Sequence, residues 1–440
     1  MSSRTRSIER PTRSRQSKKS RNALLGATFG FFTDMYDIYL PVIALAPAMV
    51  YFEPAGASIQ ETAIFAGLIF TASIIGRPLG SLIFGPIGDR YGRRKTTLIA
   101  AAGAAICTGS MCFMPGYETL GMLSIVLLIA LRLLDGVFLG GEYSAANPLA
   151  MEHAPAERRG MYGALINVGF PLSLVFITLV TMSTLALFPA GDVTASYSMW
   201  GWRIPFFIGF ILTSALFFLY LRAVPESDLW AKKKDGSAGM RNLFTREVVR
   251  VFLLACVTMT GVWFTMNGSI GVFATHFKGL GVETSTVNSI MLTAAVISAV
   301  LFPAIGHLSQ ILGRRRIILL IGLVILTFGA GGSLVSVASL GAPMMSVCAV
   351  ITIVSGFSIW ATVTAYLIEL FPTRLRSTGY GVAYSLPSII PAFYAYYMVW
   401  LSDLIPFKYT PTIIIAVGAV LIILGSASIR DTRHVDLAEV

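Results

Sequence analysis

The sequence predicts an all-α integral membrane protein with twelve transmembrane helices in two six-helix, pseudo-symmetric halves. Three observations support this fold class. The 440-residue chain is 55% hydrophobic and 12% charged, which is about half the charged fraction of a soluble domain. Apolar stretches long enough to cross a bilayer recur along the whole chain. Two polar motifs each occur twice, and in both cases the two copies are separated by about half the chain.

The apolar stretches give the order of the predicted helices. A helix satisfies its own backbone hydrogen bonds in lipid, so each stretch is expected to be helical. The predicted spans are 23–51, 62–84, 96–114, 120–145, 161–187, 202–222, 250–276, 285–310, 317–338, 343–368, 378–402 and 409–428.

The repeated motifs predict a duplicated structural unit. GPIGDRYGRRK at 85–95 recurs in degraded form as GHLSQILGRRR at 306–316, 221 residues later. The spacing E-x2-P-x3-R also occurs twice, 217 residues apart. Two-fold membrane repeats are the usual architecture of secondary transporters. The second motif comprises Glu152, Pro155 and Arg159 in its first copy, and Glu369, Pro372 and Arg376 in its second.

The distribution of the +11 net charge predicts the topology. Lys and Arg crowd the N-terminal arm and every second loop, which places both termini in the cytoplasm of a plasma-membrane protein. The arm is therefore expected to be a topological anchor and not a nucleic-acid-binding segment. The predicted regions are the basic arm 1–22, a six-helix bundle 23–222, a cytoplasmic linker 223–249, a second bundle 250–428 and a cytoplasmic tail 429–440.

The sequence contains no pattern that predicts an enzyme, a cofactor or a metal site. The four cysteines lie inside apolar stretches and lack the spacing of metal ligands, and the four histidines are scattered. We find neither a nucleophile elbow nor a phosphate-binding loop. The expected partners are a small-molecule substrate, protons and the lipid bilayer, with a monomer as the functional unit.

The loop at 85–95 matches in full the pattern G-x3-D-R-x-G-R-R-K, and in this respect the chain resembles the major facilitator superfamily. Further stretches at 77–95, 140–160, 200–210 and 369–379 resemble the metabolite:proton symporter family within it. GFFTDMYD at 30–37 is also similar to the phosphate:proton symporter family. The resemblance covers essentially the whole chain.

The resemblance implies a secondary active transporter that works by alternating access. The leading hypothesis is proton-coupled symport of a small, carboxylate-type organic metabolite. The alternatives are a phosphate or sugar proton symporter and a drug or metabolite proton antiporter. Phosphate porters typically carry an acid in span seven and a lysine in span eleven; neither is present here, which favours an organic substrate.

Charged residues inside the spans are candidates for proton coupling, because an ionised side chain in lipid costs about 2.5–3.5 kcal/mol. Asp34 and Asp37 share one face of the first span, and Arg132 lies at a comparable depth in the fourth. The resemblance implies that Asp37 and Arg132 form the coupling pair and that Glu142 is a proton or substrate site. The alternative is a static ion pair. Arg77 is the second buried cation, and it belongs either to the cavity or to packing.

The repeated loop is expected to form a gate at the cytoplasmic face. Asp89 can cap a helix of the second half, and Arg93 can pair with Glu152. In the family this network stabilises the outward-facing state. Since Gln310 replaces Asp89 in the second copy, we expect the two halves to contribute unequally. The predicted gate residues are Gly85, Asp89, Arg90, Gly92, Arg93, Arg94, Glu152, Arg159, Arg314, Glu369 and Arg376.

Polar and aromatic residues within the spans are the candidates for the substrate cavity, although aromatic belts at the membrane surface are a competing explanation for Trp and Tyr. These candidates are Tyr36, Tyr39, Tyr143, Asn167, Trp263, Asn267, Trp360, Tyr366 and Tyr384.

Overall fold

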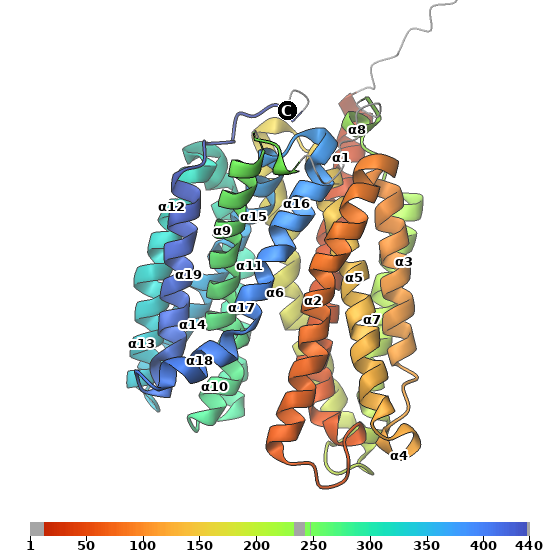
Figure 1. Ribbon diagram of the computed structural model, residues 1–440, viewed down its shortest axis with the longest axis vertical. Helices are drawn as coiled ribbons and strands as arrows, with labels where there is room; N and C mark the ends of the chain where they lie inside the picture. The colour runs from red at the N-terminus through yellow and green to blue at the C-terminus, as the bar shows by residue number, and fades with distance from the viewer. Residues whose placement is uncertain (1–12, 233–242, 247, 438–440) are drawn as a thin grey trace, which may run out of the picture.

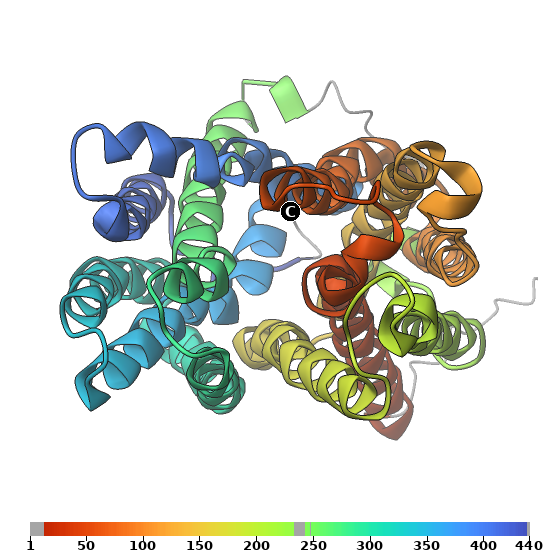
Figure 2. The same ribbon diagram turned by 90° about the horizontal axis from the view of Figure 1, so that it is seen from below.

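The computed structural model describes residues 13–232, 243–246 and 248–437, and all regular elements in these residues are helical. Most of the predicted basic arm (1–12) and much of the predicted linker lie outside the described residues, as does the end of the tail. Figure 1 shows the helices in two groups side by side, and Figure 2 shows the same division from below. The groups are called the first half, α1 to α7, and the second half, α9 to α19.

The first half crosses the molecule six times. Its first crossing continues from an α-helix into a π-helical turn and a 3₁₀ turn. Its elements are α1 (Arg13–Tyr39) with η1 (Leu40–Leu45) and η2 (Ala46–Tyr51), α2 (Ile59–Tyr91), α3 (Arg93–Met111), α4 (Tyr117–Leu120), α5 (Leu123–Glu152), η3 (Ala156–Arg158), α6 (Arg159–Leu187), η4 (Tyr197–Gly201) and α7 (Arg203–Arg222).

The second half also crosses six times, after the short helix α8 (Asp228–Lys232). Several of its crossings are divided between two or more elements. These are α9 (Val249–Met266), η7 (Asn267–Gly271) and α10 (Phe273–Gly279); α11 (Thr284–Leu312); α12 (Arg314–Val324), η8 (Ile325–Gly329) and α13 (Ala330–Ala338); α14 (Pro343–Ser358) and α15 (Trp360–Leu370); η9 (Thr373–Leu375), α16 (Arg376–Ser385), η10 (Leu386–Ser388), α17 (Ile389–Ala392) and α18 (Tyr394–Ser402); and η11 (Phe407–Tyr409) with α19 (Thr410–Ala427).

The predicted fold class is confirmed, with two differences in the elements. The first helix already begins at Arg13, so the described part of the basic arm is helical and continuous with the first span. The eleventh span is not one helix, because Pro387 and Pro391 lie where it is interrupted, and a proline lacks the N–H that a continuous helix needs. Ten crossings are long and apolar enough to be identified by length and composition alone.

The repeated loop makes the same turn in both halves. Gly92 separates α2 from α3 with a φ of +114°, and Gly313 separates α11 from α12 with a φ of +103°. Side-chain-bearing L-residues rarely adopt this conformation, so glycine is required at both positions. The turn brings the start of the next helix close to the end of the previous one.

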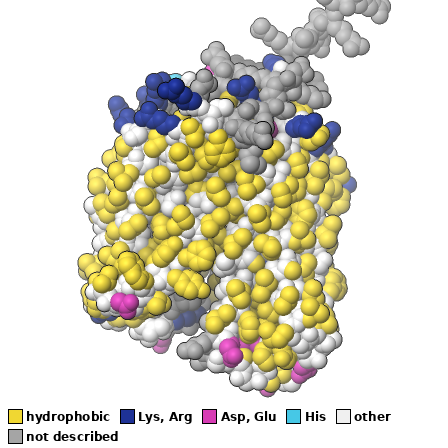
Figure 3. Space-filling view, in the orientation of Figure 1, with side chains coloured by type: hydrophobic (Ala, Val, Ile, Leu, Met, Phe, Trp, Pro, Cys, Tyr) yellow, Lys and Arg dark blue, Asp and Glu magenta, His cyan; other side chains and the backbone are white. Residues whose placement is uncertain are grey.

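The surface divides into an apolar flank and two polar ends. Figure 3 shows hydrophobic side chains over the flank and Lys and Arg gathered at the upper end. We call this the basic end; it holds the two repeated loops, and the end of the described chain lies there (Figure 1). Apolar side chains such as Phe113, 81% exposed, and Leu187, 76% exposed, are favourable in contact with lipid. The chain is thus a multi-pass integral membrane protein.

Close contact between α2 and α5 positions the buried charges of the first half. A Cβ atom added to Gly140 would lie 2.9 Å from the Cα atom of Arg77, and one added to Gly136 would lie 2.9 Å from that of Ser73. Real Cβ atoms essentially never approach so closely. Small residues of this kind allow helices to cross backbone against backbone in lipid.

We therefore expect Gly140→Ala to lower the thermal unfolding temperature of the purified protein by several degrees, since overpacking costs about 1–3 kcal/mol. Gly67→Ala is the matched control on α2, because a Cβ atom there would meet nothing within 4 Å. An equal change in both variants, measured by thermal unfolding in detergent, would contradict backbone contact at Gly140.

Candidate functional site

The first buried charge cluster lies inside the first half, between α1, α3 and α5. Arg132 donates from Nη1 to Asp37 Oδ1 at 2.6 Å and from Nη2 to the Asp37 carbonyl at 2.9 Å. Thr108 donates to the other carboxylate oxygen of Asp37 at 2.5 Å. Asp135 lies 3.1 Å from the same Nη1. Both oxygens of the Asp37 carboxylate are therefore hydrogen-bonded by neighbours within one half.

The second cluster contains two facing carboxyl groups. Asp34 of α1 and Glu142 of α5 are 1% and 2% exposed and lie close enough to interact electrostatically. Within the described chain, Asp34 Oδ2 and both carboxyl oxygens of Glu142 have no hydrogen-bond partner. Neither forms an ion pair with a described residue. Glu142 occupies the space above Gly30, where a Cβ atom would collide with it. Two buried carboxyls that face each other repel when both are ionised, so a proton on one of them is favourable.

Arg77 of α2 completes the second cluster. It is 3% exposed, and within the described chain its Nε and Nη2 atoms have no hydrogen-bond partner. Its guanidinium carbon lies 5.3 Å from the centre of the Tyr143 ring. The Arg77 guanidinium is close enough to the carboxyls of Asp34 and Glu142 for a Coulomb attraction, but it forms an ion pair with neither. The structure thus places Arg77 beside the carboxyl pair and away from the repeated loop.

An aromatic cluster joins the two halves next to Arg77. Its members come from α5, α6, α9, α15 and α16. The ring centres of Tyr143 and Tyr384 are 4.8 Å apart, those of Trp263 and Trp360 are 5.2 Å apart, and those of Trp360 and Tyr384 are 5.7 Å apart. The interface aromatic cluster is Tyr143, Phe170, Trp263, Trp360 and Tyr384.

Three polar atoms of this cluster are buried and have no partner among the described residues. They are the hydroxyls of Tyr143 and Tyr384 and the indole Nε1 of Trp360. Leaving such groups unpaired costs roughly 1–3 kcal/mol each. Together with the free edge of Arg77, they form a set of donors at the interface of the halves, which is where a bound molecule would satisfy them.

The other predicted cavity residues are divided between this interface and the interiors of the halves. Tyr39 stacks on Phe170 at 5.9 Å, and Asn167 crosses the interface to donate to the Trp360 carbonyl at 2.7 Å. Tyr36 instead donates to the Pro205 carbonyl within the first half, and Asn267 to the Pro391 carbonyl within the second. Tyr366 is buried on α15.

Residues that the sequence did not single out also lie at the interface. Phe170 contacts both Trp360 and Phe357. Asn147 donates to the Tyr380 hydroxyl at 2.7 Å, and the hydroxyls of Ser81 and Ser385 are 2.8 Å apart. A buried phenylalanine or serine has no distinguishing pattern in one sequence, so only the packing of the halves identifies these positions.

The first copy of the repeated loop binds the second half at the basic end. Asp89 accepts hydrogen bonds from the backbone N–H groups of Ser377 and Thr378 at 3.0 and 2.9 Å, and from the Thr378 hydroxyl at 2.6 Å. It therefore caps the N-terminus of α16, where the helix dipole favours an anion. A Cβ atom on Gly85 would lie 2.8 Å from the Thr378 Cα, so glycine permits this approach.

Glu152 lies at the centre of the same contact. It accepts a hydrogen bond from Arg93 of its own half at 3.4 Å and from Arg376 of the second half at 2.8 Å. Arg93 also donates to the Thr373 carbonyl at 2.6 Å. The bonds to Thr373 and from Arg376 cross between the halves and hold them together at the basic end.

The second copy of the loop makes the equivalent contact in the opposite direction. Gln310 accepts from the Gly160 N–H at the start of α6 at 3.1 Å, which is the position that Asp89 takes in the first copy. Arg314 pairs with Glu369 at 3.0 Å, as Arg93 does with Glu152. The two copies therefore differ in charge, but both bind the other half. We call Asp89, Arg93, Glu152, Arg376, Gln310, Arg314 and Glu369 the gate.

Three predicted gate residues have other contacts. Arg90 is exposed and lies over the Tyr91 ring at 5.4 Å. Arg94 binds the carbonyls of Tyr220 and Leu221 within its own half. Arg159 donates to the Val435 carbonyl at 2.6 Å.

Two acidic residues outside the repeated motifs stabilise the turns of the gate. Glu226 accepts from the backbone N–H groups of Arg93 and Arg94, and Asp431 accepts from that of Arg314. Each therefore caps the helix that follows a repeated loop. Neither residue lies in a span or a repeat, so the sequence alone did not single them out.

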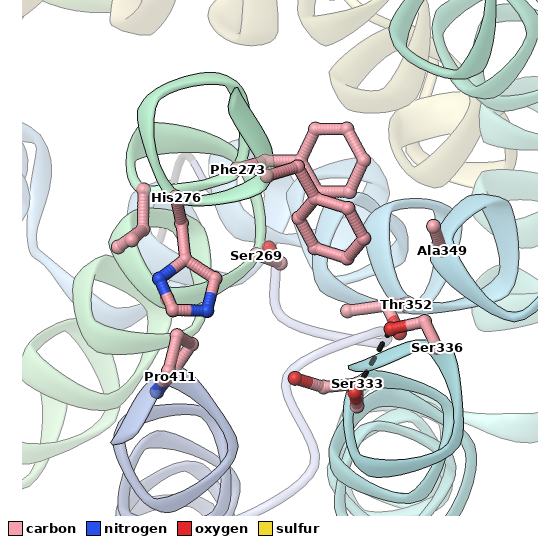
Figure 4. A pocket seen from close by; sticks show the side chains of 11 residues that line it. Ser269, Phe273, His276, Ser333, Ser336, Ala349, Thr352 and Pro411 are labelled. Carbon is pink, nitrogen blue, oxygen red and sulfur yellow. Dashed lines mark hydrogen bonds between the residues drawn. The ribbon is translucent and has the colours of Figure 1, made fainter. Parts of the chain in front are cut away.

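A small pocket inside the second half is separate from this site. Figure 4 shows His276, Ser269, Ser333, Ser336 and Thr352 around it. Its volume is about 10 Å³, which suffices for one water molecule. All of its lining residues belong to the second half, so it does not lie between the halves.

Comparison with known proteins agrees with the fold and the repeated loop. The family model described as Major Facilitator Superfamily matches residues 27–395 and also 278–439. The chain belongs to the major facilitator superfamily. Members of this superfamily are transporters, so the expectation that the chain is not an enzyme is confirmed.

Relatives within the superfamily include metabolite transporters. The chain is 30% identical to the inner membrane metabolite transport protein YhjE of Escherichia coli over 86% of both chains, and 29% identical to the alpha-ketoglutarate permease of the same organism over 84% of both. A solved structure of the proton:xylose symporter XylE bound to 6-bromo-6-deoxy-D-glucose superposes with a TM-score of 0.80 at 17% identity, covering 96% of this chain and 98% of that one. The structural likeness shows the shared fold.

The gate predicts a measurable effect on the distance between the halves. Asp89→Asn replaces one acceptor oxygen with an amide that clashes with the N–H groups of α16, so we expect spin labels at positions 95 and 315 to show a larger population of long distances. The measurement is pulsed electron paramagnetic resonance on the reconstituted protein. Asp403→Asn, an exposed site at the opposite end, is the matched control. Identical distributions in the two variants would contradict the role of Asp89.

Proposed function

We propose that this major facilitator protein is a proton-coupled symporter of a small organic carboxylate that functions as a monomer in the plasma membrane. One observation carries this proposal. At the interface of the halves, an unpaired guanidinium, Arg77, lies beside a pair of facing carboxyls, Asp34 and Glu142. The guanidinium supplies a binding site for an anion, and the carboxyl pair supplies a binding site for a proton.

Electrostatics couples the two sites. A bound anion cancels the positive charge of Arg77, which otherwise favours the ionised form of the carboxyl pair. Protonation of the pair then costs less free energy. By thermodynamic linkage, a protonated pair also favours binding of the anion by the same factor. Substrate and proton therefore tend to be loaded together and released together, which is the requirement for symport.

The Asp37–Arg132 pair fits a different role. Arg132 and Thr108 bind both carboxylate oxygens of Asp37, Arg132 also pairs with Asp135, and all of these residues belong to the first half. Breaking a buried pair costs about 3–5 kcal/mol because it leaves an uncompensated charge. We infer that this pair locks α1, α3 and α5 together, and that the proton is carried by Asp34 and Glu142.

Alternating access follows from the position of the gate. The positive-inside rule places the basic end in the cytoplasm. On this orientation the gate bonds the two halves together on the cytoplasmic side, as an outward-facing or occluded state requires. Rocking of one half against the other must break both copies of the gate before substrate can leave toward the cytoplasm.

The relatives support an organic substrate. The name of one relative specifies alpha-ketoglutarate and that of another specifies proline and betaine, so each includes a carboxylate in its cargo. The xylose symporter contributes evidence on the fold alone. Spans seven and eleven lack the acid and the lysine that phosphate porters typically carry, which disfavours phosphate.

The proton site is tested by Asp34→Asn and Glu142→Gln. In proteoliposomes with an inward proton gradient, we expect each variant to lose at least about 90% of concentrative carboxylate uptake, because the neutral side chain cannot exchange a proton. Substrate counterflow without a gradient should persist, because Arg77 is intact. The measurement is radiolabelled uptake compared with counterflow in the same preparation.

Two further variants make the test specific. Asp192→Asn, in an exposed loop, should retain both activities. Asp37→Asn should lower thermal stability and reduce uptake and counterflow together. If Asp37→Asn instead abolishes accumulation and keeps counterflow, while Asp34→Asn does not, the proton site is at Asp37. Outward transport driven by the same gradient would indicate an antiporter.

A further inference from the structure

Among the buried arginines of the described residues, Arg77 is the one whose side chain forms no ion pair or hydrogen bond. We infer, on the basis of the proposed function, that the substrate is a small monocarboxylate with an apolar or aromatic remainder, bound side-on by Arg77 with the Tyr143 and Tyr384 hydroxyls beside it. The inference narrows the substrate from carboxylates in general to carboxylates with one negative charge.

The free edge of Arg77 has the shape that a carboxylate requires. Its unpartnered atoms are Nε and Nη2, which lie on one side of the guanidinium and donate in parallel. A carboxylate accepts two parallel N–H bonds from such an edge, and this geometry is stronger and more specific than a contact with a point charge. Arg132 offers no such edge, because its Nη1 and Nη2 are bound to Asp37.

The other buried arginines of the described chain are all engaged. Arg93, Arg314 and Arg376 belong to the gate and pair with Glu152 or Glu369. Arg159 binds the Val435 carbonyl. No lysine is buried among the described residues. A second carboxylate on the substrate would therefore find no cation at the interface.

The surroundings of Arg77 oppose a second negative charge. On one side are Asp34 and Glu142, and on the other is the interface aromatic cluster, whose ring faces repel anions. The same rings pack favourably against an apolar or aromatic group. An unpaired buried charge is costly enough to lower the transport efficiency of a dicarboxylate by roughly 100-fold or more.

The test is a panel of substrates in proteoliposomes with an inward proton gradient. Benzoate, pyruvate and the zwitterion glycine betaine represent monocarboxylates, succinate and alpha-ketoglutarate represent dicarboxylates, and phosphate and xylose represent the other classes. We expect kcat/KM for the best monocarboxylate to exceed that for either dicarboxylate by about 100-fold or more. We also expect Arg77→Gln to abolish both uptake and counterflow, whereas Arg316→Gln, at an exposed position of the basic end, should alter neither.

The outcomes separate this inference from the proposed function. Proton-coupled uptake of a dicarboxylate as efficient as that of any monocarboxylate would overturn the inference and leave the proposed function intact. Transport of phosphate or xylose without transport of any carboxylate would overturn both. Arg77→Lys distinguishes side-on binding from charge alone, because lysine keeps the charge but cannot form the parallel pair; unchanged KM in this folded variant would contradict the geometry.

A different observation concerns the chain after the last span. Residues 429–437 run across the basic end and bind both halves, although they form no helix. The Val435 carbonyl accepts from Arg159 of the first half, and the Leu437 carbonyl accepts from Arg376 of the second at 3.1 Å. Leu437 is fully buried in the hydrophobic core. We propose that this segment is a strap that holds the gate closed.

The strap engages residues of the repeated E-x2-P-x3-R motif in both copies. Arg159 is the last residue of the first copy, and Arg376 is the last residue of the second. The strap therefore satisfies donors on two elements that must separate when the basic end opens. If the basic end opens, these bonds must break and Leu437 must lose its buried contacts. The strap therefore stabilises the closed state.

Removal of residues 435–440 tests the strap. We expect spin labels at positions 95 and 315 to shift toward long distances by electron paramagnetic resonance. Leu437→Ser, a milder change in the full chain, should produce a smaller shift in the same direction. A thermal unfolding scan shows whether each variant is folded. Distance distributions equal to those of the unmodified protein in both folded variants would overturn the proposal.

Discussion

The cost of leaving a charge unpaired in a low-dielectric interior determines the arrangement of this protein. Six arginines and several carboxylates are buried in the described chain, and nearly all of them are matched by an ion pair or a hydrogen bond. At the gate and at the Asp37–Arg132 pair, each of these buried charged groups forms at least one ion pair or hydrogen bond. The exception is the group formed by Arg77, Asp34 and Glu142, which lies where the two halves meet. In a membrane interior, an unmatched group of this kind is a strong indication of function.

The gate illustrates how duplication produces two equivalent contacts between the halves. In each copy, the end of one helix caps the start of a helix in the other half, and an arginine at the next turn pairs with a glutamate. The bonds are formed at helix termini, where backbone N–H groups would otherwise be unsatisfied. Each of these bonds contributes only a modest free energy, and the stability of the contact comes from their number. Such a contact can hold one conformation without preventing the other, provided that water satisfies the same groups after opening.

The two candidate charge clusters show why the sequence could identify the residues but not their roles. Asp34 and Asp37 share a helix face by their spacing, and the sequence placed both near Arg132. In the structure both face α5 but meet it at different depths: Arg132 of α5 and Thr108 of α3 bind Asp37, while Asp34 lies beside Glu142, further along α5. The difference depends on how α1 is placed along α5. A single sequence contains no information on that placement.

The sequence by itself determined the membrane location, the helical class, the duplication and the chemical identity of the gate, because hydropathy, spacing and charge are properties of the chain alone. The tertiary structure alone decided that Arg77 lacks a partner within the described chain, that Gln310 keeps the position of Asp89, and that Leu437 is buried at the basic end. Each of these depends on which side chains from distant segments meet, and the energy of a buried charge is set by those neighbours and not by its position in the chain.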